Sequence, residues 1–411
     1  MADAPAMPLS GTPLKDRFLG VDVARGVALL SMLAANIFVV VYDDGADTPT
    51  LAGMTVTGRS ATMFVTVAGI SLAFLTGGRH PMDGRSRRAA AVGIAVRALA
   101  IGAIGLAVGY VAGSNLNVIL PYYALFFLLA IPFVDLRPRT LAIIAGGLAV
   151  IGPLILLWAS YLGFEGTDGR SVTFTDAVTN PTGFVLELFL GSYPAVVYMV
   201  YVLAGMAIGR LDLSSTVVAT RLMVGGLVMA VVAWVVSSVI LFKLGGLQQL
   251  IDAAGPETDP KTITNDTLWD AGRVDSWWWL AIRSHHAATP IDAVHSLGCA
   301  IAVLGIVLLV TKLPIGRHLL WPVGVAGAMT LTIYSTHALV QGSGWLLDDH
   351  PIVLYVLSVA GALVFAVLWR HFFGQGPLER VVSLVSGRAR RAAMGWRWTD
   401  RSDSNTRAGG R

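Results

Sequence analysis

The sequence predicts an all-α integral membrane protein with about ten transmembrane helices and both termini in the cytoplasm. Only 13% of its 411 residues are charged and 55% are hydrophobic, whereas soluble domains carry roughly 25% charged residues. Ten apolar runs follow one another, each close to the ~20 residues that span a bilayer. The loops between them alternate between basic and acidic. This composition disfavours a soluble protein, and the single cysteine, Cys299, rules out an internal disulfide or a thiolate metal cluster.

The ten predicted helices are taken directly from the apolar runs, and their ends are approximate. The second run is short, and the sixth carries Tyr193-Pro194 near its start. In order, the runs lie near residues 19–42, 60–77, 89–112, 117–135, 140–162, 190–209, 217–243, 291–312, 319–341 and 351–373.

The predicted orientation in the membrane rests on the charges of the loops. Lys and Arg accumulate in cytoplasmic loops, and here every second loop and both ends are basic. An odd number of crossings would break this alternation. The basic segments hold Lys15 and Arg17; Arg79, Arg85, Arg87 and Arg88; Arg137 and Arg139; Arg210 and Arg221; Lys312 and Arg317; and Arg388, Arg390 and Arg391. The acidic segments hold Asp43, Asp44 and Asp47; Glu165 and Asp168; Glu257, Asp259, Asp266, Asp270 and Asp275; and Asp348 and Asp349.

One transmembrane domain is expected over residues 17–380. A disordered cytoplasmic tail, 1–16, precedes it and a basic cytoplasmic tail, 381–411, follows it. The only long loop, 245–290, is expected to be extracytoplasmic. Its run of three tryptophans, 277–279, is either an interfacial anchor or a surface on which a sugar stacks. No cleavable signal peptide is predicted, and the expected location is the plasma (inner) membrane, with multiple passes.

The first predicted helix carries three polar residues, Asp22, Arg25 and Asn36, in one stripe with Leu29 and Met32. Spacings of three, four, three and four place all five on one face of a helix. Asp22 and Arg25 can pair at i, i+3 near the cytoplasmic end, and Asn36 lies about 21 Å further along the axis. The pair is either structural or part of an inner phosphate or proton site. Asn36 either bonds between helices or takes part in chemistry.

Other polar residues lie inside or beside the predicted spans. Arg97 either snorkels towards the headgroups or joins Arg25 and the basic loop 79–88 in an inner site for a phosphate-bearing donor. Several histidines at one depth favour a general base among them, because imidazole titrates near neutral pH. No metal-binding, nucleotide-binding or nucleophile-elbow motif occurs. The predicted outer residues are Arg59, Tyr122, Tyr193, His285, His286, His295 and His337.

A series of motifs runs through nearly all predicted helices. It opens with Arg17-Phe-Leu-Gly-Val-Asp22-Val-Ala-Arg25-Gly26-Val-Ala-Leu-Leu and ends the first helix with Asn36. In this order, the series resembles the heparan-alpha-glucosaminide N-acetyltransferase-like family of the transmembrane acyltransferases, in its bacterial branch. The later motifs are Arg59-Ser60 through Ala68-Gly69-Ile-Ser-Leu-Ala, Leu120-Pro121-Tyr122-Tyr123, Gly191-Ser-Tyr193-Pro194, Leu203-Ala-Gly205, Gly209-Arg-Leu-Asp, Leu331-Thr-Ile-Tyr334-Ser-Thr-His337 and Gly376-Pro377-Leu378-Glu379.

The resemblance implies an enzyme that moves an acetyl or longer acyl group from cytosolic acyl-CoA to a glycan or lipid-linked sugar on the far side of the membrane. Asn36 matches the family's active-site asparagine. The family's catalytic histidine, about a dozen residues later, has no match in Asp43-Asp44-Gly-Ala-Asp47. Asp44, Asp47, His285, His286 and His337 are candidate replacements.

The expected catalytic residues are Asn36, His337, His286 and Asp47, and the expected donor-binding residues are Asp22, Arg25, Arg97, Arg59, Tyr122 and Tyr193. The donor is acetyl-CoA or another acyl-CoA, no metal is expected, and membrane lipid and a carbohydrate or glycolipid acceptor are the partners. Nucleic acid is not expected, and a homodimer is one candidate assembly. Two other functions stay open: a transporter or flippase, and a non-catalytic partner in envelope assembly.

Overall fold

The computed structural model describes residues 16–39, 41–42, 48–113, 116–164, 169–269, 274–343 and 350–395. Nearly all of the predicted disordered segment 1–16 lies outside these ranges, as does the predicted catalytic residue Asp47. Of the predicted basic tail 381–411, only the part up to residue 395 is described.

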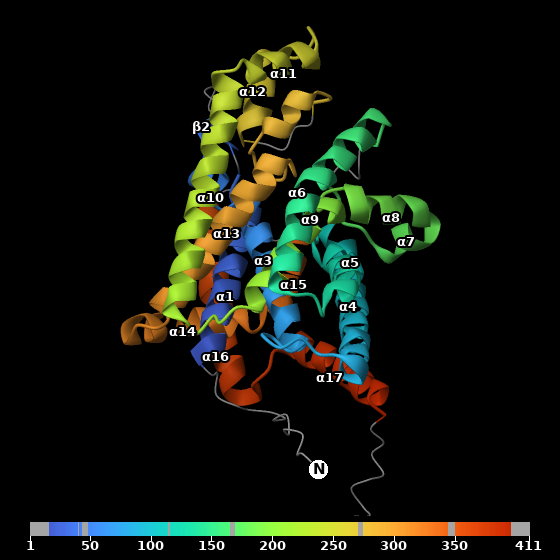
Figure 1. Cartoon of the computed structure of the whole chain (residues 1–411), viewed down its shortest axis with the longest axis vertical. Helices are drawn as coiled ribbons and strands as arrows, with labels where there is room; N and C mark the ends of the chain where they lie inside the picture. Colours follow the sequence, from blue (N-terminus) through green and yellow to red (C-terminus); the bar gives the residue numbers. More distant parts are fainter. Residues whose placement is uncertain are drawn as a thin grey trace, which may run out of the picture.

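The described chain is a bundle of helices, as the composition predicts (Figure 1). Seven of the described helical segments are long and apolar enough to cross a membrane. One of them, Leu51–Leu75, joins α2 (Leu51–Thr55) to α3 (Arg59–Leu75). The other six lie in α1 (Asp16–Ile37), α4 (Gly84–Ala112), α6 (Pro138–Tyr161), α10 (Thr216–Phe242), α13 (Pro290–Val310) and α16 (Pro351–Phe373).

Three further predicted spans have an irregular form. Helix α8 (Pro181–Leu190) meets α9 (Ala195–Gly209) at a bend of 51°, and α14 (Pro314–Gly327) meets α15 (Thr330–Gly342) at a bend of 68°. A shorter apolar helix, α5 (Leu120–Ala130), continues into the 3-10 turn η1 (Ile131–Phe133). The prediction of an all-α membrane protein is confirmed. Ten crossings and cytoplasmic termini remain predictions.

The first predicted run, 19–42, is shorter than expected because α1 ends at Ile37. The chain then forms a short antiparallel pair, β1 (Val41–Tyr42) with β2 (Thr48–Pro49). Thr50 caps the following α2 by accepting a hydrogen bond from the Gly53 amide. A turn therefore replaces the last part of the expected helix.

At each bend a carboxylate side chain accepts hydrogen bonds from the chain: Glu379 at the bend before α15 and Glu187 at the bend before α9. At the start of α15, the Thr332 amide and hydroxyl both donate to the Glu379 carboxylate, so the free end of the helix is satisfied. Between α8 and α9, the Ser192 amide donates to Glu187. Pro194 then disfavours helical backbone at the residue before it. The sixth and ninth predicted runs are thus interrupted at points where a side chain takes the place of a helical hydrogen-bond partner.

Small residues bring the central helices into close contact. A Cβ atom at Gly205 of α9 would clash with the Thr66 carbonyl oxygen of α3. A Cβ atom at Gly327 of α14 would clash with the Asp22 carbonyl oxygen of α1. Such contacts let helix backbones approach closely in a membrane protein. They fix α1, α3, α9 and α14 around the region that holds the predicted site residues.

The two ends of the bundle differ. The end where α1 begins and α17 (Pro377–Ala393) lies, called here the terminal end, is closed by α17 packing against α4 (Figure 1). The far end carries α11 (Gly246–Ala254), α12 (Pro260–Trp269) and the 3-10 turn η2 (Trp277–Ala281). These surround a small apolar core in which Trp279 is buried, while Trp277 is 67% exposed.

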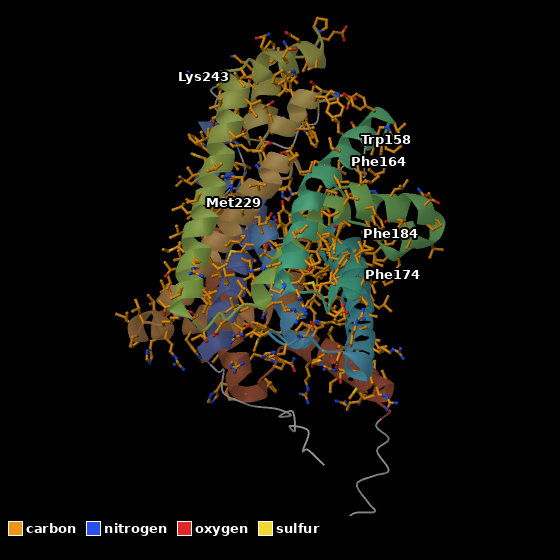
Figure 2. All side chains as sticks on the ribbon, viewed as in Figure 1. Trp158, Phe164, Phe174, Phe184, Met229 and Lys243 are labelled. Carbon is orange, nitrogen blue, oxygen red and sulfur yellow. The ribbon has the colours of Figure 1, made fainter. Side chains whose placement is uncertain are left out.

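Labelled side chains show where the helices lie between the terminal end and the far end (Figure 2). Helix α10 runs from the terminal end through Met229 to Lys243 at the far end. Phe174 of α7 (Phe174–Thr179) and Phe184 of α8 lie on an arm that projects to one side of the bundle. Because α1 also begins at the terminal end, Asp22 and Arg25 lie towards that end and Asn36 towards the far end.

Candidate functional site

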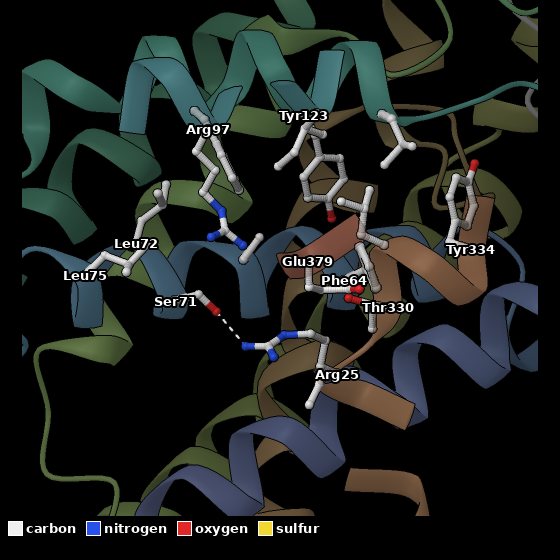
Figure 3. Close-up of a pocket in the computed structure, with 16 residues that line it drawn as sticks. Arg25, Phe64, Ser71, Leu72, Leu75, Arg97, Tyr123, Thr330, Tyr334 and Glu379 are labelled. Carbon is white, nitrogen blue, oxygen red and sulfur yellow. Dashed lines mark hydrogen bonds between the residues drawn. The ribbon is translucent and has the colours of Figure 1, made fainter. Parts of the chain in front are cut away.

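A cavity of about 150 Å³ lies inside the bundle, between α1, α3, α4, α5, α15 and α17 (Figure 3). We call it the Arg25 cavity. Its polar lining comes from Arg25, Ser71, Arg97, Tyr123, Thr330, Tyr334 and Glu379. Its apolar lining comes from side chains such as Phe64, Leu72, Leu75 and Phe127.

Arg25 is held in place by three neighbours. Its guanidinium donates to Asp22 Oδ1 at 2.7 Å, to the Gly327 carbonyl oxygen at 3.2 Å and to Ser71 Oγ at 2.8 Å. The predicted Asp22–Arg25 pair is therefore confirmed. Because the bonds come from α1, α3 and the end of α14, the pair ties three helices together. It also fixes one positive charge at the cavity wall.

Arg97 is placed differently. Figure 3 shows it extending from α4 into the cavity, on the side opposite Arg25. It makes no hydrogen bond or ion pair with any residue in the described ranges. The carboxylate of Glu379 lines the same cavity, but both of its oxygens accept hydrogen bonds from Thr332. A guanidinium with unused donors in a largely apolar cavity is suited to an anionic ligand.

The hydroxyl of Tyr123 adds a second unused polar group. Its oxygen is buried without a hydrogen-bond partner among the described residues, and the side chain is 4% exposed. In Figure 3 this oxygen points towards the cavity. Buried polar groups normally have partners, so this hydroxyl is a candidate to bond to a ligand in the cavity.

Asn36 and His337 come together although 301 residues separate them. The Asn36 side-chain amide lies 3.5 Å from His337 Nε2. Gln341, one turn after His337, donates to the Asn36 carbonyl oxygen and so fixes the end of α1 against α15. Tyr334 of the cavity wall precedes His337 by three residues, or about 4.5 Å along the helix axis. The pair therefore lies within about one helical turn of the Arg25 cavity.

Tyr122, Tyr193 and His286 form another cluster, centred on Tyr193. The ring centroids of Tyr122 and Tyr193 are 5.2 Å apart, and those of Tyr193 and His286 are 5.5 Å apart. The Tyr198 hydroxyl lies 3.4 Å from His286 Nδ1. His286 has a backbone φ of 58°, which is unusual for a residue other than glycine. Strain of this kind often occurs at functional sites.

Glu187 belongs to this cluster and was not among the predicted site residues. Its Oε1 accepts a hydrogen bond from the Tyr122 hydroxyl at 2.7 Å, while Oε2 is buried without a partner among the described residues. The side chain is 1% exposed. A single carboxylate in the apolar run Phe184–Leu190 was the available signal, because ionisable residues inside a span are functional candidates. Ser71 and Glu379 were also missed as site residues.

Arg59 lies apart from the Arg25 cavity. It opens α3 and donates to the Met54 carbonyl oxygen at 3.1 Å. Its charge acts on His285, whose pKa is lowered to about 3, first by burial and then by the neighbouring His286 and Arg59. His285 is therefore neutral at physiological pH.

The predicted site residues thus fall into separate groups. Asp22, Arg25 and Arg97 meet at or beside the cavity, and Asn36 meets His337. Tyr122, Tyr193 and His286 cluster together, whereas Arg59 joins none of these groups. No group of three or more His, Cys, Asp or Glu residues in the described ranges is arranged to hold a metal ion.

Two family models match the chain. The catalytic domain of heparan-alpha-glucosaminide N-acetyltransferase matches residues 17–240, which is more than half of the chain. A family described as a protein of unknown function (DUF418) matches residues 267–388. The first match holds Asn36 and both cavity arginines, and the second holds His337 and Glu379. A comparison with curated proteins finds no match.

Proposed function

Because the chain belongs to the heparan-alpha-glucosaminide N-acetyltransferase family, we propose that it transfers an acetyl or longer acyl group from acyl-CoA to a glycan or lipid-linked sugar. The family match supports a membrane protein with acetyltransferase-like function. The single observation that carries the proposal is that the Asn36–His337 pair lies within one helical turn of a cavity whose Arg97 has no partner among the described residues.

The donor is proposed to enter the Arg25 cavity from the terminal end. At about 150 Å³ the cavity holds only part of a CoA molecule; a cavity of about this volume accommodates a benzene-sized ligand. Among the described residues Arg97 has donors free for a phosphate or pyrophosphate oxygen, and Arg25, paired with Asp22, lies on the opposite wall. Arg25 and Asn36 are eleven residues apart on α1, or about 16 Å. An extended pantetheine arm is long enough to cover this distance.

The transfer is assigned to Asn36 and His337. The acceptor oxygen or nitrogen attacks the thioester carbonyl carbon, a new C–O or C–N bond forms, and the C–S bond breaks. His337 accepts the acceptor's proton as general base and returns it to the departing CoA thiolate. The Asn36 amide orients the imidazole and donates a hydrogen bond to the developing oxyanion. His337 thus takes the place of the family histidine that the first loop lacks.

The sidedness follows the predicted topology. Acyl-CoA is supplied in the cytoplasm, so the terminal end of the bundle faces inwards and the acceptor is modified at the far side of the plasma membrane. The Tyr193 cluster, with its aromatic rings and a Glu187 oxygen that has no partner among the described residues, is proposed to contact the rest of the acceptor, beyond the group that reacts at His337. Asp47 lies outside the described residues and remains a candidate second base.

Binding and hydrolysis of acyl-CoA by the purified protein in detergent test this function. The proposal predicts binding of acetyl-CoA or a longer acyl-CoA, with slow release of free CoA in the absence of an acceptor. Asn36→Ala should bind the donor normally but release CoA at least 100-fold more slowly. Failure of the wild-type protein to bind any acyl-CoA would favour a transporter or an assembly partner instead.

A further inference from the structure

A second hollow, of about 400 Å³, opens on the outside of the bundle between α1, α15 and α16. We call it the His337 groove. Its volume falls within the range of about 300–1,000 Å³ that small-molecule sites show. Of its eleven lining residues, only Thr336, His337 and Ser358 are polar. The imidazole that contacts Asn36 is thus part of a wall that is otherwise almost entirely apolar.

The groove faces the region that the bilayer occupies. Helix α16 is the least buried of the candidate spans in the described chain, and its Val353, Leu357 and Val364 are half exposed or more. The lining extends along α16 from Leu354 to Phe365, which is about 16 Å at 1.5 Å per residue. This length is roughly half of a hydrocarbon core of ~30 Å. The groove therefore matches the depth of one leaflet.

The groove is separate from the Arg25 cavity, and the two share no lining residue. Helix α15 divides them: it presents Thr330, Leu331 and Tyr334 to the cavity and Ile333, Thr336, His337 and Val340 to the groove. A donor bound in the cavity leaves the groove free. His337 is thus positioned where a second molecule, arriving from the lipid, meets the first.

We propose that the His337 groove binds the hydrocarbon chain of a lipid-borne acceptor, whose hydroxyl- or amine-bearing headgroup lies beside Asn36 and His337. This inference rests on the proposed acyl transfer and narrows its acceptor to a membrane lipid. The bond changes are those given above: the headgroup oxygen or nitrogen replaces the thioester sulfur on the acyl carbon, and its proton leaves through His337. The apolar walls hold the chain by van der Waals packing, because a chain that comes from the lipid is already out of water.

Gly361 provides a way to fill the groove. It lies in the groove lining, and a Cβ atom there would meet no atom within 4 Å. Gly225 of α10 is a matched control, because it is also an exposed helical glycine with no atom within 4 Å of a Cβ. Gly361→Phe should therefore obstruct the groove without a backbone clash, while Gly225→Phe adds the same ring elsewhere on the lipid-facing surface.

The test uses a glucoside with a long alkyl chain that carries a photoreactive diazirine, added to the protein in phosphatidylcholine nanodiscs. Wild-type protein and Gly225→Phe should be labelled on α15 and α16, and unlabelled glucoside should reduce this labelling at least fivefold. Gly361→Phe should lose at least 80% of it. Competition in the wild-type protein keeps the test decisive if Gly361→Phe does not fold.

Labelling of the groove that unlabelled glucoside does not displace, or that is equal in Gly361→Phe and Gly225→Phe, would overturn the inference. The same holds if photoreactive phosphatidylcholine labels the groove and the glucoside cannot displace it, because bulk lipid then fills it. Labelling needs no acyl-CoA, so it is independent of the proposed chemistry. Failure of acyl-CoA binding would contradict the proposed function, whereas loss of glucoside labelling alone would contradict only the lipid-borne acceptor.

Discussion

Replacing Arg97 with methionine separates donor binding from stability. Arg97 has no hydrogen bond or ion pair in the described part of the chain, so its removal takes nothing from the bundle's own bonds. If it binds a phosphate oxygen of the donor, a charge-assisted hydrogen bond of ~1.5–3 kcal/mol is lost. At about 1.4 kcal/mol per tenfold change, the Kd for acyl-CoA should rise roughly 10- to 100-fold. Thermal stability should stay the same or increase, since a poorly solvated charge is removed.

Arg25→Met is the matched comparison on the other wall of the cavity. Arg25 bonds to Asp22, Ser71 and the Gly327 carbonyl oxygen. Its removal leaves the Asp22 carboxylate without its partner; because 14% of the Asp22 side chain and 23% of the Arg25 side chain are exposed, the cost should lie below the about 3–5 kcal/mol of a fully buried pair. Unfolding in detergent, followed by thermal scanning, should therefore show a lower midpoint for Arg25→Met and not for Arg97→Met. Normal acyl-CoA affinity in Arg97→Met together with a lowered midpoint would show that Arg97 is structural and would refute this reasoning.

Three other outcomes are expected. Gly327→Ala should destabilise the protein by about 1–3 kcal/mol, as overpacking does, because its Cβ would clash with the Asp22 carbonyl oxygen. Gly225→Ala, with no atom within 4 Å of its Cβ, should be neutral in the same thermal scan. Burial lowers the pKa of His285 to about 3 in the folded protein. On acidification the unfolded state therefore takes up this proton at a higher pH than the folded state, and the free energy of unfolding should fall as the pH drops from about 6.5 to 3. Thermal scans of His285→Gln should show a weaker acid dependence, and an unchanged one would exclude His285 as its source. Asn36→Asp should bind acyl-CoA with wild-type affinity but turn over at least tenfold more slowly, because a carboxylate cannot donate to the oxyanion; a wild-type rate would remove Asn36 from the chemistry.

The fold class followed from the sequence because each apolar run carries its own signal. Composition and run length are local properties, and the Asp22–Arg25 pair is local too, at i, i+3 on one helix. The bends between α8 and α9 and between α14 and α15 were not predicted. They depend on the side chains of Glu187 and Glu379, and Glu379 lies 47 residues from the threonine that it caps.

The sequence predicted individual site residues, but not which of them lie next to one another. Asn36 and His337 were both named, but no local pattern indicates that α1 and α15 bring them to 3.5 Å. Arg59 was grouped with the donor-binding residues, whereas it donates to the Met54 carbonyl oxygen of α2 and its charge acts on His285 in the loop before α13. Glu187 had a local signal, since it is the one charged residue in an apolar run. Its partner Tyr122 lies 65 residues away and could be found only from the fold.

Release of CoA from acetyl-CoA by the purified protein, measured alongside donor affinity in three proteins, tests the central claim most directly. The wild-type protein should bind acetyl-CoA and release CoA, His337→Gln should bind it with the same Kd but release CoA at least 100-fold more slowly, and Arg97→Met should bind it at least tenfold more weakly. This pattern would separate a donor site at the cavity from a reaction site at Asn36 and His337. Equal release by the wild-type protein and His337→Gln, or no acetyl-CoA binding by the wild-type protein, would contradict the account.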